Sequence, residues 1–146
     1  MQHHKDQFSE KIVEIKRTSK KTKGGNAIAF SALCVVGDKK GKVGVALGKA
    51  PDVASAIRKG MKRARKHMIT VPIKNQTIPH YVEVKEGAAR ILLKPAPQGT
   101  GVRAGGPVRA VVETAGIQNI VSKILGTRNK LSNVYAAMKA LKKLRS

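Results

Sequence analysis

The chain has 146 residues, of which 30 are lysine or arginine and only 8 are aspartate or glutamate, so its formal net charge is +22. A surface with that imbalance repels itself unless a polyanion covers it, so we expect nucleic acid as the partner, with an anionic membrane as the weaker alternative. Because no apolar run is long enough to span a bilayer and residues 1–10 lack the apolar core of a secretory signal, we predict a cytoplasmic protein with no membrane partner.

The first domain is predicted over residues 8–73 and begins with strands. Residues 11–18 are compatible with a strand, and a basic loop that contains glycine follows at residues 19–25. Alternating and β-branched residues then predict a hairpin with strands at 27–36 and 42–47.

Two features of this hairpin concern packing. Gly44 and Gly48 would let another backbone approach the second strand closely. Cys34 lies in the middle of the first strand among apolar neighbours, so we expect a small buried hydrophobe. As the only cysteine, it excludes an internal disulfide and a cysteine zinc cluster.

A basic helix is predicted over about residues 51–68. Pro51 suits the first turn, and Asp52 stands where the helix dipole favours a carboxylate. At about 100° per residue, an apolar stripe that should face the sheet consists of Val53, Ile57, Met61, Ala64 and Met68. The opposite face has no acid and consists of Arg58, Lys59, Lys62, Arg63, Arg65 and Lys66. This face favours contact with phosphates over a merely solvated surface.

The second domain is predicted over residues 78–146, after a linker at 71–76. Residues 78–85 and 90–94 predict a second hairpin. A glycine loop follows, and Pro107 then begins a helix that Gly116 ends. A short strand at about residues 121–125 and a last helix at about 130–144 complete an α+β fold.

The glycine loop, residues 99–106, is the feature that comes nearest to an enzyme motif. It matches neither the P-loop pattern nor G-x-G-x-x-G, so a nucleotide site is not supported. Contact with RNA phosphates or protein, and a turn that needs unusual backbone angles, both stay open. The acids form no metal-spaced cluster with His67 or His80. We therefore expect no catalytic residue, metal, cofactor or small-molecule substrate.

Aromatic side chains are scarce, with only two phenylalanines and two tyrosines in the chain. Proteins that stack unpaired bases present a set of exposed aromatic rings. We therefore expect folded RNA that is recognised through its phosphates and shape. The candidate RNA-binding residues are Arg17, Ser19, Lys20, Lys21, Lys23, Gly24, Gly25, Lys39, Lys40, Lys42, Lys49, Arg58, Lys59, Lys62, Arg63 and Lys66.

Short glycine- and lysine-containing strings occur in order along nearly the whole chain. They include RTSKKTKGG at residues 17–25, GKA at 48–50, GTG at 99–101 and AGG at 104–106. In this order they resemble the family of bacterial small-subunit ribosomal protein five. The resemblance implies a double-stranded-RNA-binding-like β-β-β-α domain followed by a left-handed β-α-β domain.

The same resemblance implies a structural constituent of the small ribosomal subunit. Such a protein binds small-subunit rRNA, supports subunit assembly and supports translational accuracy near the mRNA entry channel, with small-subunit proteins four and eight as neighbours. Its first-domain loop, here residues 18–26, approaches the spectinomycin site. The implied interface with protein four consists of Gly101, Arg103, Gly105, Gly106 and Arg109.

Two other classes of protein stay open. A free double-stranded-RNA-binding module or RNA chaperone would leave residues 99–109 unexplained. A protein subunit of an RNA-processing ribonucleoprotein should carry aromatic residues for its substrate strand, which are few in this chain.

Overall fold

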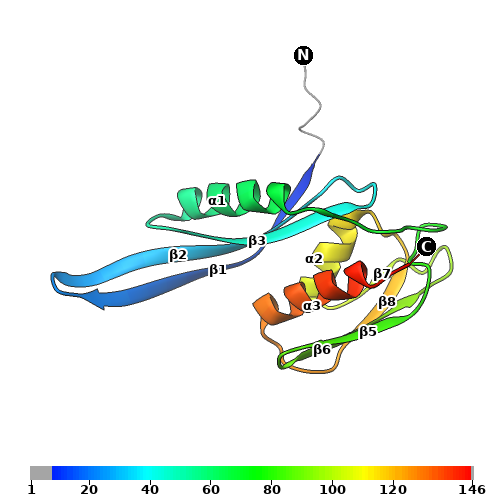
Figure 1. Ribbon diagram of the computed structural model, residues 1–146. Helices are drawn as coiled ribbons and strands as arrows, with labels where there is room; N and C mark the ends of the chain where they lie inside the picture. Colours follow the sequence, from blue (N-terminus) through cyan, green and yellow to red (C-terminus); the bar gives the residue numbers. More distant parts are fainter. Residues whose placement is uncertain (1–7, 146) are drawn as a thin grey trace, which may run out of the picture.

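The computed structural model describes residues 8–145, without the side chains of residues 20–22 and 26. Within this range the strands are β1 (Ser9–Thr22), β2 (Gly25–Gly37), β3 (Lys42–Ala50), β4 (Ile69–Thr70), β5 (Val82–Glu86), β6 (Ala89–Pro95), β7 (Val102–Arg103) and β8 (Ile120–Ile124). The helices are α1 (Val53–Lys66), α2 (Gly106–Ala115) and α3 (Lys130–Lys142). The predicted α+β fold, with a β-β-β-α region before a β-α-β region, is confirmed (Figure 1).

The described strands form two sheets, in the orders β1-β2-β3-β4 and β5-β6-β8-β7. In the first sheet all neighbours are antiparallel, and β4 adds a short strand beyond β3 that was not predicted. In the second sheet β5, β6 and β8 are antiparallel, while β7 runs parallel to β8. The chain passes from β7 to β8 through α2, which gives the β-α-β unit.

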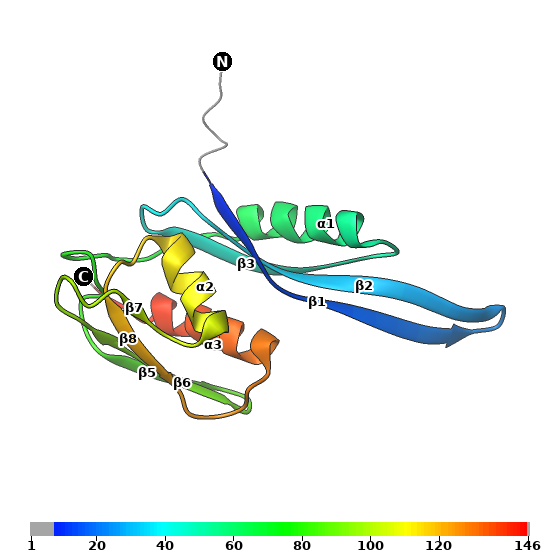
Figure 2. The same cartoon turned by 180° about the vertical axis from the view of Figure 1, so that it is seen from behind.

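Both faces of the first sheet are covered around β3 and residues 32–36 of β2. Helix α1 lies on one face, and α2 and α3 lie between the other face and the second sheet (Figures 1 and 2). Along β2, Cys34 and Val36 belong to the core under α1, whereas Leu33 and Val35 belong to the core shared with α2 and α3. This arrangement explains why residues 32–36 are uninterruptedly apolar, since a strand buried on both faces has no solvent-facing position.

Helix α1 lies unusually close to β3 because the contact is made by glycines. A β-carbon at Gly48 would lie 2.2 Å from the carbonyl oxygen of Ala56 and 2.3 Å from the backbone nitrogen of Gly60. A β-carbon at Gly44 would lie 2.1 Å from the carbonyl oxygen of Ala64. The predicted close approach of a backbone to this strand is therefore confirmed.

The predicted apolar stripe of α1 is partly wrong. Val53 is 37% exposed, and the side of the helix that meets the sheet consists of Ala56, Gly60, Met61 and Ala64. The contact is centred on Ala56 and Gly60, because residues with little or no side chain allow the backbones of α1 and β3 to approach. A periodicity weighted by side-chain hydrophobicity gives glycine and alanine too little weight at such a contact.

The predicted loop at residues 19–25 is also wrong, because these residues continue the β-ribbon. Strands β1 and β2 pair without interruption from the bulge near Val13 to the pair Thr22–Gly25, so Lys23 and Gly24 form a two-residue turn. The ribbon extends beyond the end of α1 as a long arm (Figures 1 and 2). A φ of 128° at Gly25 explains why a glycine follows this turn.

The second half agrees with the predicted elements to within a few residues. The hairpin β5–β6 turns at Gly87, and its first strand begins at Val82, later than predicted. Gly116 ends α2 with a φ of 99°, and the side chain of Asn129 begins α3 by accepting a hydrogen bond from the backbone of Ser132. In residues 8–145, none of the helices is both long and apolar enough to cross a membrane.

The turn between β2 and β3 joins the two halves through backbone atoms. Lys39 and Gly41 donate backbone hydrogen bonds to the carbonyl oxygens of Thr114 and Ala115, at 3.0 and 2.8 Å. These carbonyls belong to the last turn of α2, where no intrahelical donor is present for them. The first half therefore caps a helix of the second half.

Candidate nucleic-acid interface

A groove with a basic lining runs between α1 and β3. We call it the basic groove; it has a volume of about 710 Å³ and is lined by Leu47, Gly48, Lys49, Lys59, Lys62, Arg63 and Lys66. Five of these seven residues are cations and none is acidic. The close contact at Gly48 sets the position of the helix, so that the lysines of its outer edge lie beside Lys49 at the end of β3.

The cations of the basic groove keep their charge available. Among the described residues, the ion pairs involve Lys11, Lys16, Arg65, Arg90, Arg109 and Lys139, and no cation of the groove. Arg63 is held in place, because its guanidinium donates a hydrogen bond of 3.0 Å to the carbonyl oxygen of Leu47. An uncompensated row of cations in a groove is suited to a chain of phosphates.

The basic band predicted on α1 divides in the structure. Arg65 forms an ion pair with Glu10 of β1, so it belongs to the far side of the helix. Arg58 donates a hydrogen bond of 3.0 Å to the hydroxyl of Ser55 and does not line the groove. The structure therefore brings Lys49 together with four of the helix cations and separates Arg58 and Arg65 from them.

The other candidate RNA-binding residues lie at two separate places. Lys39, Lys40 and Lys42 belong to the turn that caps α2, where the carboxylate of Asp38 accepts hydrogen bonds from the backbones of Lys40 and Lys42. The remaining candidates are on the arm, at Arg17, Ser19, Lys20, Lys21, Lys23, Gly24 and Gly25. All of those described are exposed, and the side chains of Lys20 and Lys21 lie outside the described part.

The glycine loop at residues 99–106 begins with a turn and continues into β7 and the start of α2. Gly99 and Gly101 have φ values of 95° and 77°. Their backbone nitrogens donate hydrogen bonds of 3.2 and 3.0 Å to the side-chain oxygen of Asn119. These two amides are satisfied inside the protein, and the interpretation as a turn with unusual backbone angles is confirmed. Contact of the loop with RNA phosphates or protein stays a prediction.

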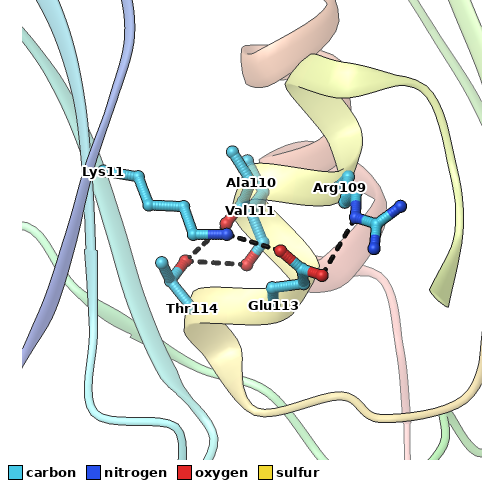
Figure 3. A network of polar contacts seen from close by, with 6 residues as sticks. All are labelled: Lys11, Arg109, Ala110, Val111, Glu113 and Thr114. Carbon is cyan, nitrogen blue, oxygen red and sulfur yellow. Dashed lines mark hydrogen bonds and ion pairs between the residues drawn. The ribbon is translucent and has the colours of Figure 1, made fainter. Parts of the chain in front are cut away.

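An arginine of the candidate protein interface has a partner within the chain. Arg109, on the first turns of α2, donates a hydrogen bond of 3.0 Å to Glu113 one turn later. The other carboxylate oxygen of Glu113 accepts a hydrogen bond of 2.5 Å from Lys11 of β1 (Figure 3). Beside them, the hydroxyl of Thr114 donates to the carbonyl oxygens of Ala110 and Val111.

This network was not predicted from the sequence, although the spacing of one of its ion pairs could have indicated it. The spacing of four residues between Arg109 and Glu113 is the usual one for a helical ion pair. Lys11 lies 102 residues from Glu113, and only the fold brings them together. The hydrogen bond from Lys11, with a smaller contribution from Arg109, lowers the pKa of the Glu113 carboxyl below its ordinary value. The carboxylate therefore stays charged and ties α2 to β1.

Cys34 is buried in the contact between the sheet and α1, as predicted. A β-carbon at Gly60 would lie 2.5 Å from its sulfur atom. Burial, with a smaller effect of the Glu10 charge, raises the pKa of the thiol to about 11. Since the thiolate is the reactive form, Cys34 acts as a packing residue.

Two family patterns together match most of the chain. The pattern described as "Ribosomal protein S5, N-terminal domain" matches residues 8–72, and the one described as "Ribosomal protein S5, C-terminal domain" matches residues 84–146. The small ribosomal subunit protein uS5 of Thermotoga neapolitana is 54% identical over 139 residues, which are 95% of this chain and 78% of that protein. The chain belongs to the ribosomal protein S5 family.

Other members of the S5 family are similar over the same length. The small ribosomal subunit protein uS5 of Thermus thermophilus is 49% identical over 95% of this chain and 86% of its own length. That of Mycoplasmopsis agalactiae is 52% identical over 97% of this chain and 62% of its own length.

Membership of the S5 family confirms the predicted resemblance and assigns the class of function. The chain is a structural, RNA-binding constituent of the small ribosomal subunit, and its family is not a family of enzymes. The alternatives of a free RNA-binding module and of an RNA-processing subunit are therefore wrong.

Proposed function

We propose that the chain binds small-subunit rRNA mainly through the basic groove and thereby supports assembly of the subunit. One observation carries this proposal: the groove gathers Lys49, Lys59, Lys62, Arg63 and Lys66 without an acid among its lining residues. Each of these side chains is exposed, so a phosphate reaches it without any rearrangement of the core. A net charge of +22 supplies the long-range attraction for the same partner.

The first test changes Lys59, Lys62, Arg63 and Lys66 to glutamine together and measures affinity for small-subunit rRNA at several salt concentrations. We expect the slope of log affinity against log salt to become shallower by a few units, about 0.9 for each lost contact with a duplex phosphate. The thermal midpoint should change little, because the four side chains are exposed.

A matched control removes the same charge elsewhere. Lys85, Lys94, Lys123 and Arg128 are exposed and belong to the second half, away from the groove. Glutamine at these four positions should leave the slope closer to that of the natural chain. Equal slopes for both quadruple variants would mean that the groove is merely a solvated surface.

We also propose that the arm formed by β1 and β2 contacts rRNA near the spectinomycin site. Its length and its exposed cations Arg17 and Lys23 support a contact at a distance from the groove. The shape of its tip depends on the two-residue turn at Lys23 and Gly24.

Deletion of Lys23 is expected to change the spectinomycin response of ribosomes that carry the variant. The pair Thr22–Gly25 cannot close over a single residue, so the tip must open or the ribbon must shift its register. Lys23→Ala keeps the length of the turn and is the control for loss of charge alone. Drug sensitivity of the deletion equal to that of the natural chain would contradict this placement of the arm.

The contacts with proteins are a further part of the proposal. Arg103 is exposed in β7, and Gly105, Gly106 and Arg109 are exposed at the start of α2. Gly106 and Arg109 line a hollow of about 350 Å³ together with Ile12 and Pro107. This surface suits protein four, with protein eight as a second neighbour and a position near the mRNA entry channel of a cytoplasmic ribosome. Through protein four, the chain would support translational accuracy.

The division into domains at residues 8–73 and 78–146 is also a proposal. In its favour, the first sheet ends with β4 and the second begins with β5. The apolar core is continuous across this division, since Leu33, Val43, Val108 and Leu141 belong to one buried cluster. The two proposed domains therefore have separate sheets and share one core.

A further inference from the structure

A second hollow lies next to the basic groove, where α1 ends and α3 passes β3. We call it the tyrosine pocket; it has a volume of about 400 Å³ and is lined by Val45, Ala46, Leu47, Arg63, His67, Ile69, Tyr135, Met138 and Lys142. Its volume lies within the range of about 300–1,000 Å³ that is usual for pockets that bind small molecules. Tyr135, Met138 and Lys142 of this pocket belong to neither the basic groove nor the candidate protein interface.

The lining of the tyrosine pocket has two chemical parts. Its apolar part comes from three elements of the fold and includes Leu47, Ile69 and Met138. Tyr135 of α3 also lines the pocket and is 40% exposed, so it is accessible to a ligand. Arg63 and Lys142 add positive charge, and no acidic residue lines the pocket.

The tyrosine pocket and the basic groove are continuous. Leu47 and Arg63 line both hollows. The hydrogen bond from the Arg63 guanidinium to the Leu47 carbonyl oxygen holds this arginine at the boundary. A phosphate chain that follows the groove therefore reaches the mouth of the pocket at a fixed cation.

We propose that the tyrosine pocket takes one unpaired RNA base from a strand whose backbone lies in the basic groove. The base lies against the ring of Tyr135 and the apolar side chains, while Arg63 and Lys142 hold the flanking phosphates. Aromatic rings bind bases of any sequence by stacking, and cations beside them hold the backbone. The proposal rests on the proposed function, because the groove must deliver the strand.

An unpaired base fits this site better than an acidic peptide does. Carboxylates would satisfy the cations and leave the open face of Tyr135 and the apolar part without a partner. A nucleotide supplies both the flat face of its base, which can lie on the ring, and a phosphate next to that base for the cations. The scarcity of aromatic residues argued against stacked bases in the sequence, but one ring at the mouth of a phosphate groove is enough for one base.

The test uses the full chain and two RNA duplexes that are identical except that one strand of the second carries a single bulged 2-aminopurine. We expect the bulged duplex to bind about fivefold or more tightly than the continuous one, and the 2-aminopurine fluorescence to fall on binding. Tyr135→Leu keeps an apolar side chain but removes the ring, so it should abolish this preference and leave affinity for the continuous duplex unchanged.

Two control variants separate the pocket from general effects. Tyr81→Leu removes the other tyrosine, which is 50% exposed and does not line the pocket, and should keep the preference for the bulge. Arg63→Gln should weaken binding of both duplexes, whereas Arg58→Gln, on the same helix but outside both hollows, should weaken them less. Thermal midpoints check that each variant is folded.

The outcomes distinguish the two proposals. Equal affinity of the natural chain for both duplexes would overturn the pocket and leave the groove intact, as expected if a protein segment covers the pocket in the subunit. A preference that survives Tyr135→Leu would also overturn it. Failure of both duplexes to bind, or a salt slope that the quadruple glutamine variant leaves unchanged, would overturn the groove and the pocket with it.

Discussion

Gly48→Ala is expected to lower the stability of the protein by about 3 kcal/mol or more, because the added β-carbon has no space. It would lie 2.2 Å from the carbonyl oxygen of Ala56 and 2.3 Å from the backbone nitrogen of Gly60. Overpacking costs about 1–3 kcal/mol where side chains yield, but these atoms belong to the backbone of α1. A decrease of roughly 10 °C in the thermal midpoint would follow for a chain of this length.

Gly106→Ala is the matched control for Gly48→Ala. Gly106 begins α2, and a β-carbon there would meet no atom within 4 Å. Alanine is favoured over glycine in a helix, so this change should leave the thermal midpoint unchanged or raise it slightly. If Gly48→Ala melts at the temperature of the natural chain, α1 does not contact β3 as closely as the structure has it.

The effect of Gly48→Ala should extend to RNA binding. Because the basic groove is formed by Lys49 on β3 and by cations on α1, separation of the helix from the strand widens it. We expect weaker binding to small-subunit rRNA at a temperature at which the variant is still folded. The close contact at Gly48 thus determines both the packing of α1 on β3 and the spacing of the phosphate-binding cations.

Most helices and strands, and the class of partner, could be predicted from the sequence because local signals agree with the fold at these places. Pro107 and Gly116 delimit α2 by their own backbone preferences, and four cations of α1 line one groove, as the charge of this helix indicated. The glycines at 44 and 48 indicated a close approach, because the absence of a side chain inside a strand needs such a reason. These signals depend on neighbours within a few residues.

The sequence misled where tertiary packing decides the outcome. Residues 19–25 carry lysines and glycines that are typical of a loop, yet pairing with β2 extends them into the arm. The contact face of α1 is centred on Ala56 and Gly60 because the sheet opposite has glycines at the matching places. Neither feature can be predicted from its own segment, since each depends on the strand or helix that packs against it.

The tyrosine pocket and the Lys11–Glu113 contact could not have been predicted for the same reason. Val45, Ile69 and Tyr135 come from three distant parts of the chain and meet only in the fold. The site of an RNA-binding protein is in this respect harder to infer than its charge. Composition predicts that phosphates bind, whereas the place where a base enters depends on how the two halves pack.

Arg109→Leu is expected to raise misreading by ribosomes that carry it, while rRNA binding and subunit assembly stay nearly intact. The reason is that Arg109 is exposed at the surface proposed for protein four, where loss of a contact would favour the closed decoding state of the subunit. An arginine can hold a carboxylate through two parallel hydrogen bonds, which leucine cannot replace. The measurement is the rate of misreading in translation with reconstituted subunits.

The Glu113 carboxylate makes this test of Arg109 specific. Arg109 and Lys11 both donate to Glu113, so loss of Arg109 leaves the contact between α2 and β1 in place. Glu113→Gln instead weakens that contact and frees Arg109 for a partner. It should therefore lower the stability of the protein by about 1 kcal/mol or less. Misreading should not rise, because Arg109 keeps its contact with protein four. Arg90→Leu removes an equivalent pair with Glu83 on the second sheet and should leave accuracy unchanged. Normal accuracy with Arg109→Leu, or failure of its subunits to assemble, would contradict this role of Arg109 in accuracy.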